Sequence, residues 1–320
     1  MSEQLLVGNS TIVTMDDERG IIENGAVLCE DGIIKKIGKT VDLLKEYPGT
    51  KYLDTGGMIV MPGMINAHHH LYSTFARGMA LKNEPPENFT QILERLWWRL
   101  DNALSMEDIY VSALVPLIDG LKRGTTCIID HHASQHTIPG SLDEISKAAM
   151  EVGVRHCLCY ETSDRWGEEI ARQGIEENER FIKRCKENPD DMRAAAFGLH
   201  ASFTVSEKTL EKCMEITEKY GAIFHSHVAE DKADVDDSME KYGMPILKRF
   251  EKSGALDNGF LAIHCIHINE EEEDIIKNKG VMVVHNPESN MNNGVGCARV
   301  PEFLEKGLVT GLGTDGFTSD

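Results

Sequence analysis

The stretch Met61-Pro62-Gly63-Met64-Ile65-Asn66-Ala67-His68-His69-His70 decides the fold class and points to a metal site. The hydrophobic run 58–61 predicts a strand, which the turn pair Pro62-Gly63 ends before the histidines follow. Because His68 and His70 are two residues apart, extended backbone points both side chains the same way, as two ligands of one metal ion require. A His-x-His pattern alone is only a weak indication of such a site.

Three further motifs strengthen this indication, because each stands at the end of a separate apolar, strand-like run. They are His227-Val228-Ala229-Glu230, Ala262-Ile263-His264-Cys265 and Gly313-Thr314-Asp315-Gly316. Together they add two imidazoles and two carboxylates to the first pair of histidines. The sequence therefore predicts one site assembled from several strand ends.

These residues carry a resemblance to the amidohydrolase superfamily, specifically to its mononuclear deaminase and chlorohydrolase branch. Pro-Gly-x-x-Asn-x-His-x-His, His-x-x-Glu, His285-Asn286-Pro287 and Thr-Asp-Gly all stand in the order of that family. The chain resembles most closely the aminohydrolases called SsnA, in 96–101, 130–134 and 289–293. The resemblance runs from about residue 5 to residue 320 and stops there, whereas the family continues.

Composition excludes several classes of protein. At 320 residues the chain can hold one large domain, or a large and a small one. A net charge of −20 argues against binding to nucleic acid or to anionic membranes, but allows a small-molecule substrate. No apolar run approaches the ~20 residues of a membrane span. Eight cysteines without a C-x-x-C pattern are typical of buried thiols in a reducing cytoplasm, so we expect a cytoplasmic protein.

The first part of the chain, residues 1–57, predicts the N-terminal part of a small β-rich domain, which the resemblance implies to be a β-sandwich. Short strand candidates with turns fill residues 4–60. The pair Asp31-Gly32 between apolar runs predicts a hairpin.

From residue 58 onward, apolar strand runs alternate with helical stretches, which is typical of a parallel sheet. The runs lie near 58–66, 125–131, 154–160, 193–199, 222–228, 260–265, 281–285 and 308–314. Eight such units predict an α/β fold, a closed (β/α)8 TIM-type barrel over residues 58–320. Ser141 and Asn269 each stand three residues before a glutamate and predict helix N-caps.

The barrel prediction gives the motifs a common place, because catalytic residues of barrel enzymes lie at the carboxyl ends of the strands. The candidate residues fall at or just beyond these ends: His68, His70, His200, His227, His264, His285 and Asp315. Six strands that end in this way are hard to attribute to chance.

Three neutral imidazoles and one carboxylate suit one divalent ion, Zn2+ or Fe2+, with a position left for water. We assign His68, His70, His227 and Asp315 as ligands, and the family pattern implies the same four. A metal of this kind lowers the pKa of its water. Asp315 can then take the first proton, and His264, which is not a ligand, can orient the nucleophile.

Glu230 follows His227 by three residues, where the strand ends and the chain turns, so it can face the same cavity. The resemblance gives Glu230 the role of proton shuttle to a ring nitrogen and to the leaving amine. It also places His200 where relatives contact substrate, whereas His285 can be either a substrate contact or an orienting residue. The strand run 193–200 holds no lysine, the residue that becomes carboxylated in binuclear relatives, so one metal is the better count.

We therefore expect a metal-dependent hydrolase that deaminates an amino-substituted purine, pyrimidine or related heterocycle and releases ammonia. Two alternatives stay open: hydrolysis of chloride from a similar ring, and a non-catalytic binding protein that keeps the barrel. The resemblance makes a homo-oligomer possible. Loops 71–105, 131–141 and 161–170, with Asp164 and Arg165 as candidates, are expected to set specificity. Trp97 and Trp98 are expected in the core unless one lines the entrance.

The chain ends five residues after Asp315, before the final helix that a closed barrel needs over strands eight and one. We expect a barrel truncated after its eighth strand, that is, a fragment whose C-terminal part is missing.

Overall fold

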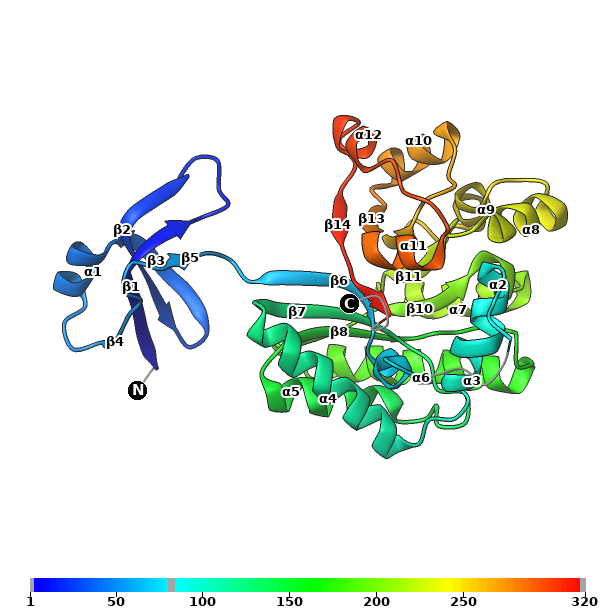
Figure 1. The fold of residues 1–320 in the computed structure, drawn as a ribbon, viewed down its shortest axis with the longest axis horizontal. Coiled ribbons are helices and arrows are strands. Elements are labelled where there is room, and N and C mark those ends of the chain that lie inside the picture. The colour runs from blue at the N-terminus through cyan, green and yellow to red at the C-terminus, as the bar shows by residue number, and fades with distance from the viewer. Residues whose placement is uncertain (1–2, 80–83, 317–320) are drawn as a thin grey trace. The chain divides into compact units, whose positions relative to one another are not determined.

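The computed structural model describes residues 3–79 and 84–316. Between Gly63 and Met64 the chain divides into two compact units, each described here by itself. Figure 1 shows the first unit in blue and the second in the colours from cyan to red.

The first unit is one five-stranded sheet with a short helix. Its order is β3 (Ile33–Lys39), β2 (Ile21–Glu30), β1 (Gln4–Val13) and β4 (Lys51–Asp54), with β5 (Ile59–Val60) also paired to β1. Asp31 and Gly32 both have positive φ, 50° and 79°, and join β2 to β3 as the predicted hairpin. Leu43 of α1 (Thr40–Glu46) packs with Leu6 and other buried side chains of the sheet.

The second unit begins with the strand that carries the histidine stretch, and that strand is not where the sequence predicted it. Ile59 and Val60 pair with β1 of the first unit, while the first strand of the second unit is β6 (Met64–His70). The turn Pro62-Gly63 therefore separates two strands of different units rather than a strand from a histidine loop. His68 and His70 lie within the extended backbone itself.

Parallel strands form two sheets in this unit. One has the order β15 (Asp315–Gly316), β6, β7 (Thr125–His132), β8 (Arg155–Tyr160) and β9 (Arg193–Ala195). The other has the order β10 (Phe197–Ala201), β11 (Phe224–Val228), β12 (Phe260–His264), β13 (Met282–His285) and β14 (Thr310–Leu312).

The two sheets meet at two places, where β9 continues into β10 and where β14 continues into β15. With each of these pairs counted as one barrel strand, the sheets form an eight-stranded barrel. The fourth barrel strand changes partner at Ala196, where the residues on either side pair with β8 and with β11. The eighth changes partner at 313–314: the backbone N–H of Gly313 donates to His285, and that of Thr314 donates to His68. The predicted (β/α)8 fold is confirmed, with its fourth and eighth strands each in two pieces.

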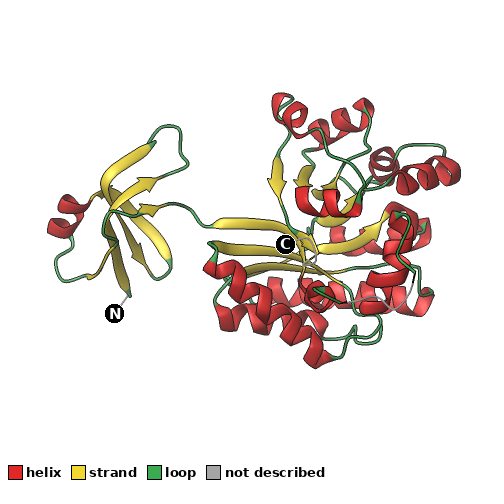
Figure 2. Cartoon of the chain, viewed as in Figure 1, coloured by secondary structure: helices red, strands yellow, loops and turns green. Residues whose placement is uncertain are grey.

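Helices lie on the outer side of these strands (Figure 2). After β6 come η1 (Leu71–Ala76), α2 (Phe89–Ile92), the π-helical turn η2 (Leu93–Trp97), α3 (Trp98–Leu100) and α4 (Met106–Lys122). The later elements are α5 (Ser141–Val152), α6 (Glu168–Glu187), η3 (Ser202–Thr204), α7 (Glu207–Tyr220), α8 (Lys232–Tyr242), α9 (Ile246–Ser253), α10 (Glu270–Lys279), α11 (Pro287–Asn293) and α12 (Val300–Glu305).

Of the two predicted N-caps, one is confirmed and one is wrong. Asn269 accepts a hydrogen bond from the backbone N–H of Glu272, whose side chain returns one to Asn269, so α10 begins with a capping box. Helix α5 instead has Gly140 as its N-cap, and Ser141 is the first helical residue. The left-handed turn at Gly140, with φ 88°, starts the helix one residue earlier than the Ser-x-x-Glu pattern indicated.

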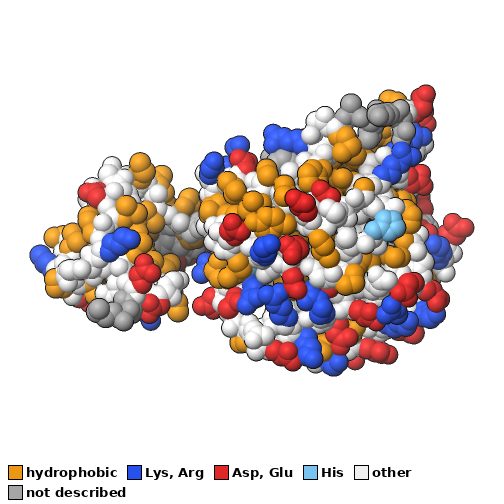
Figure 3. All heavy atoms as spheres, turned by 90° about the horizontal axis from the view of Figure 1, so that it is seen from below, with side chains coloured by type: hydrophobic (Ala, Val, Ile, Leu, Met, Phe, Trp, Pro, Cys, Tyr) orange, Lys and Arg blue, Asp and Glu red, His pale blue; other side chains and the backbone are white. Residues whose placement is uncertain are grey.

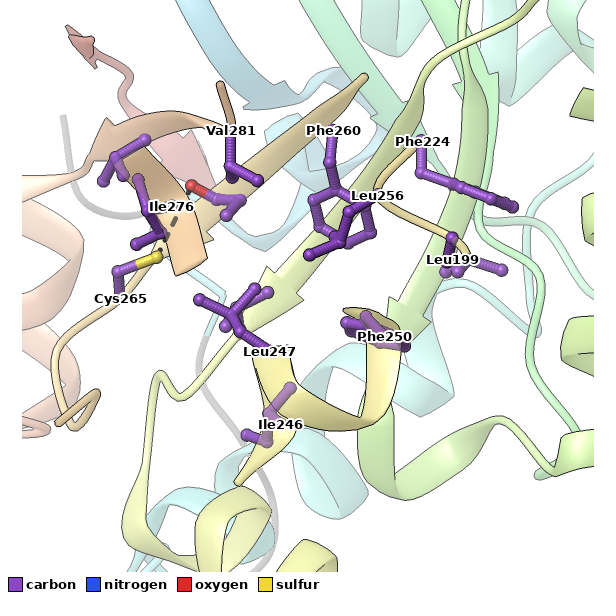
Figure 4. Close-up of a cluster of buried hydrophobic side chains, with 14 of the residues drawn as sticks. Leu199, Phe224, Ile246, Leu247, Phe250, Leu256, Phe260, Cys265, Ile276 and Val281 are labelled. Carbon is purple, nitrogen blue, oxygen red and sulfur yellow. Dashed lines mark hydrogen bonds between the residues drawn. The ribbon is translucent and has the colours of Figure 1, made fainter. Parts of the chain in front are cut away.

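The core of the unit lies between strands and helices. Phe224, Phe260 and Phe250 pack with tilted rings in one cluster, in which α9 packs against β11 and β12 (Figure 4). A second cluster joins β7 and β8 to α4, α5 and α6. These two apolar layers hold the strand ends in place, and so position the site.

The surface carries both signs of charge, with acidic and basic side chains interspersed over the face seen in Figure 3. All eight cysteines are free thiols. In the described part of the chain, no helix is both long and apolar enough to cross a membrane.

Candidate metal centre and active site

Five predicted residues meet at the carboxyl ends of four barrel strands, and all are buried. His68 and His70 come from β6, His227 from β11, His264 from β12 and Asp315 from β15. Asp315 Oδ1 lies 3.2 Å from Nε2 of both His68 and His70. His70 Nε2 lies 3.1 Å from His227 Nε2.

Hydrogen bonds from the Nδ1 atoms to backbone carbonyl groups fix the tautomers of two of these histidines. Nδ1 of His70 lies 2.6 Å from the carbonyl oxygen of His131, and Nδ1 of His227 lies 2.7 Å from that of His200. A carbonyl oxygen only accepts, so both Nδ1 atoms carry a proton, and in the neutral imidazoles that a metal ligand requires both Nε2 atoms present lone pairs. Two lone pairs 3.1 Å apart repel each other unless a cation lies beside them.

The third imidazole is oriented from deeper in the barrel. Nδ1 of His68 lies 2.8 Å from His225 Nε2, and His225 Nδ1 lies 3.5 Å from Cys159 Sγ. The Cys159 thiol donates to the carbonyl of Asp130, which leaves its sulfur free to accept from His225. This chain of donors leaves His68 Nε2 as an acceptor directed at Asp315, as a metal ligand requires.

The cluster therefore fits a divalent cation. Three sets of possible ligand atoms occur among the described residues, with the atoms of each set within 4.8 Å of one another: His68–His227–His264–Asp315, His70–His131–His227 and Glu161–His200–His227. Burial lowers the pKa of His70, but its hydrogen bond to Asp315 and the charge of that carboxylate raise it to about 9. The arrangement thus attracts positive charge, and buried N/O donors of this number are a typical zinc set.

His264 and Glu230 lie beside this cluster. His264 Nδ1 is 2.8 Å from Asn290 Oδ1, which fixes its proton there and leaves Nε2 as the acceptor. This Nε2 is buried without a hydrogen-bond partner among the described residues, 3.4 Å from Glu230 Oε2 and 3.8 Å from Asp315 Oδ2. Both side chains thus face the place where a reacting group would sit.

The two carboxyl groups near His264 have opposite proton affinities. Burial, reinforced by the charge of Asp315, raises the pKa of Glu230 well above its usual range. For Asp315, burial raises the pKa, but the neighbouring imidazoles of His68 and His70, with Nε2 atoms 3.2 Å from Oδ1, hold it well below its usual range. Paired carboxyls with pKa values pushed apart are the usual arrangement for acid and base roles in one site.

At three of these strand ends, a residue other than glycine has backbone in the left-handed region. Ala229, His264 and Asp315 have φ values of 48°, 72° and 59°. Left-handed backbone at non-glycine residues costs of order 1–3 kcal/mol and clusters at functional sites. At Ala229 it turns the chain after His227 so that Glu230 lies at the cavity, as the sequence predicted.

A cavity opens above the cluster, and its walls are largely aromatic and acidic. The aromatic wall residues are Tyr72, Phe89, Trp97, Trp98 and Phe203, and the acidic ones are Glu161, Glu230, Asp231, Asp234 and Asp315. Trp97 and Trp98 both line it, so the structure favours the alternative in which one of them lines the entrance over a place in the core. The segment 89–100 folds over the cavity instead of into the apolar layers.

The two predicted substrate contacts have different positions. His200 lines the cavity, with Nδ1 held 2.7 Å from Thr204 Oγ1. His285 is not among the wall residues, and its Nδ1 lies 3.5 Å from the side-chain amide of Asn290, the partner of His264. Its position favours the alternative in which it orients other residues.

At the end of the third barrel strand, the sequence analysis identified Arg165 as a candidate but missed Glu161. Glu161 follows β8 directly, is 4% exposed and lines the cavity. Arg165, expected in a specificity loop, is buried behind it and donates to Glu161 and to Asp101. Asp164 accepts from the N–H of Ser206 and the hydroxyl of Thr209 at the start of α7, away from this cavity. The one available signal for Glu161 was its position directly after a predicted barrel strand.

Comparisons with known proteins agree with this architecture. The sequence profile of the Amidohydrolase family matches residues 59–319. The 5'-deoxyadenosine deaminase of Methanosarcina acetivorans is 33% identical over 316 residues, 99% of this chain and 70% of that protein. The 5-methylthioadenosine/S-adenosylhomocysteine deaminase of Halothermothrix orenii is 32% identical, over 99% of this chain and 71% of that protein.

Among solved structures, an adenosine deaminase from Xanthomonas campestris with bound zinc has a TM-score of 0.83 and 23% identity, covering 98% of this chain and 70% of that chain. At this identity the likeness shows a shared fold. The profile match over most of the chain and the relatives above 30% identity show more: the chain belongs to the amidohydrolase family.

Proposed function

We propose that this protein is a metal-dependent hydrolase that removes the amino group of an aminated purine ring and releases ammonia. The observation that carries the proposal is the buried cluster in which His70 and His227 direct Nε2 lone pairs at one another, next to Asp315. Relatives above 30% identity are named for deamination of adenine nucleosides, which supports the purine as the ring.

His68, His70, His227 and Asp315 would hold one divalent ion, and zinc is favoured by the imidazole-rich set and by the zinc in the adenosine deaminase of the same fold. A divalent ion in such a site supplies a water-derived nucleophile at neutral pH. The hydrogen bonds at the Nδ1 atoms would keep each imidazole in the orientation that this role requires.

The remaining side chains would manage protons. Asp315 would accept the proton of the attacking water, since its carboxylate is kept ionised by the surrounding histidines. Glu230 would donate a proton to the ring nitrogen next to the attacked carbon. It would then take the proton of the added hydroxyl group as the carbonyl forms and pass it to the departing amine, and the proton held by Asp315 would restore Glu230. His264 Nε2, held by Asn290 through Nδ1, would orient the nucleophile between them.

The test is ammonia release by metal-replete protein from adenosine, 5'-deoxyadenosine, 5'-methylthioadenosine and guanine. We expect at least one of these aminopurines to be deaminated. Failure on all four, with a zinc-loaded and folded protein, would contradict the purine assignment.

We also propose a cytoplasmic location, because all eight cysteines are free thiols and four of them lie in the apolar strands β7, β8 and β2. Assembly into a homo-oligomer stays a prediction.

A further inference from the structure

Three carboxylates of the cavity, those of Glu161, Asp231 and Asp234, have no part in the proposed reaction. Glu161 is 4% exposed, and an oxygen of its side chain lies within 4.8 Å of ring nitrogens of both His200 and His227. It thus lies beside the proposed metal ligand His227 and next to the predicted substrate contact His200. The protein has buried an acidic group at a place that a substrate can touch.

Arg165 fixes this carboxylate from behind. One guanidinium nitrogen donates to Glu161 Oε1 at 2.7 Å, and another donates to Asp101 Oδ2 at 2.7 Å. The guanidinium also lies 5.3 Å from the ring centroid of Trp98, which lines the cavity. Because Arg165 is itself buried and always charged, it keeps Glu161 ionised and in one place without entering the cavity.

The other wall carboxylates already have partners or roles. Asp234 accepts from the backbone N–H groups of Phe203 and Ala229, and Asp231 accepts from that of Ala233 as the N-cap of α8. Glu230 and Asp315 belong to the proposed reaction. Both oxygens of Glu161 have a neighbour, Arg165 at Oε1 and His131 Nδ1 at 3.3 Å from Oε2, but each carboxylate oxygen can accept a second hydrogen bond, and this side chain lines the cavity.

The formally charged side chains that line the cavity are all acidic. In the described ranges, 3–79 and 84–316, the residues that line the cavity include acidic and aromatic side chains but neither lysine nor arginine. An ionised carboxylate accepts hydrogen bonds and cannot donate them, so its ligand must offer an N–H, an O–H or a positive charge. Nothing in the described wall offers a counter-charge to a phosphate or carboxylate group.

We propose that Glu161 is a specificity-determining residue, which binds a hydrogen-bond donor or cationic group of the substrate and makes the cavity select neutral or cationic aminated rings over anionic ones. This inference rests on the proposed function. It narrows the substrate class to free bases, nucleosides and positively charged derivatives, and it excludes nucleotides.

The first experiment compares each of two nucleosides with its own 5'-monophosphate as substrates of the wild-type enzyme. Metal-replete protein is given adenosine or adenosine 5'-monophosphate, and guanosine or guanosine 5'-monophosphate, and kcat/KM is measured for each. We expect the phosphate to lower kcat/KM by about 100-fold or more, since like charges meet in a desolvated site. Equal values within either active pair would overturn the charge selection while leaving deamination itself intact. Absence of turnover on every aminopurine would instead overturn the proposed function.

The second experiment uses Glu161→Gln, which keeps the shape and can still accept from Arg165. We expect kcat/KM for the neutral member to fall by about tenfold to 100-fold, mainly through KM, with zinc content unchanged. The penalty for the phosphorylated member should shrink relative to wild type. A merely structural role of Glu161 would not change that ratio.

Glu168→Gln is the matched control, because it removes one negative charge seven residues further along the chain, at the first residue of α6, where the side chain is 86% exposed and paired with Lys208. It should leave both kinetic constants and the neutral-to-phosphorylated ratio at wild-type values. A Glu161→Gln enzyme with wild-type KM and ratio would overturn the role of Glu161. Should that variant not fold, the wild-type comparison of the two pairs decides the inference.

Discussion

At the scale of single residues, the site combines groups that the sequence could identify with one network that it could not. The histidines and Asp315 could be identified from the sequence because each stands at the end of an apolar run, and barrel geometry brings such ends together. The Asp101–Arg165–Glu161 group joins three places in the chain whose meeting depends on how the segment after β6 folds over the cavity. No spacing in the sequence encodes that contact.

Replacing Glu230 by glutamine tests the proton role. The amide keeps the size of the side chain but cannot transfer a proton, so turnover should fall by about 10²–10⁴-fold. Zinc content, measured by elemental analysis, should stay at the wild-type level, because Glu230 is not among the proposed ligands. His68→Asn is the contrasting variant and should lose the metal itself. Near wild-type deamination by zinc-loaded Glu230→Gln protein would remove Glu230 from the mechanism.

A glycine next to the site tests how tightly the eighth strand is held. A Cβ at Gly313 would lie 2.4 Å from Asn286 Oδ1 and 2.8 Å from the backbone oxygen of His68. Gly313→Ala should therefore displace Asp315 or His68, with a loss of about 1–3 kcal/mol in the free energy of unfolding and weaker zinc binding.

The control for that change is Gly38→Ala, where the nearest side-chain atom lies 3.9 Å from the added Cβ. Urea unfolding and zinc titration of both variants give the comparison. Equal behaviour of the two would show that the approach of Gly313 to His68 is not needed.

At the scale of elements, the number and order of the barrel strands could be predicted, and the limits of some could not. Apolar runs locate strands, but they do not say which sheet a strand joins, so Ile59 and Val60 were assigned to the barrel although they pair with β1. The same limit of sequence-based prediction applies to Trp97 and Trp98, since the sequence pattern of an aromatic pair is the same whether the pair packs in a core or lines a cavity.

The two Ser/Asn-x-x-Glu patterns allow a direct test of helix capping. Asn269 accepts from the N–H of Glu272, so Asn269→Ala should destabilise α10 by about 1 kcal/mol. Ser141 caps nothing, and its hydroxyl is buried without a hydrogen-bond partner among the described residues, so Ser141→Ala should be neutral or stabilising. Thermal unfolding of both variants measures the difference. A greater loss in Ser141→Ala would contradict the assignment of the caps.

At the scale of the whole molecule, the metal is expected to bind once per chain. The fourth barrel strand, in its two pieces 193–195 and 197–201, presents His200 at its end and holds no lysine to bridge a second ion. Elemental analysis should therefore give about one zinc or iron per chain. Two tightly held ions per chain would contradict the single site.

Removal of that metal should destabilise the barrel unit, because the Nε2 lone pairs of His70 and His227, 3.1 Å apart at the ends of two strands, repel each other without a cation. Ligand binding to the folded state adds about 4 kcal/mol when the free ligand is 1,000-fold above its Kd. In a domain of this size each kcal/mol corresponds to roughly 2–4 °C in Tm. A chelator should thus lower the Tm of the full chain by several degrees, and added zinc should restore it. His68→Asn, with one ligand missing, should respond far less to either treatment. If chelation removes the metal and Tm does not change, the close approach of His70 to His227 is tolerated without a cation, and the cluster is not built around a metal ion.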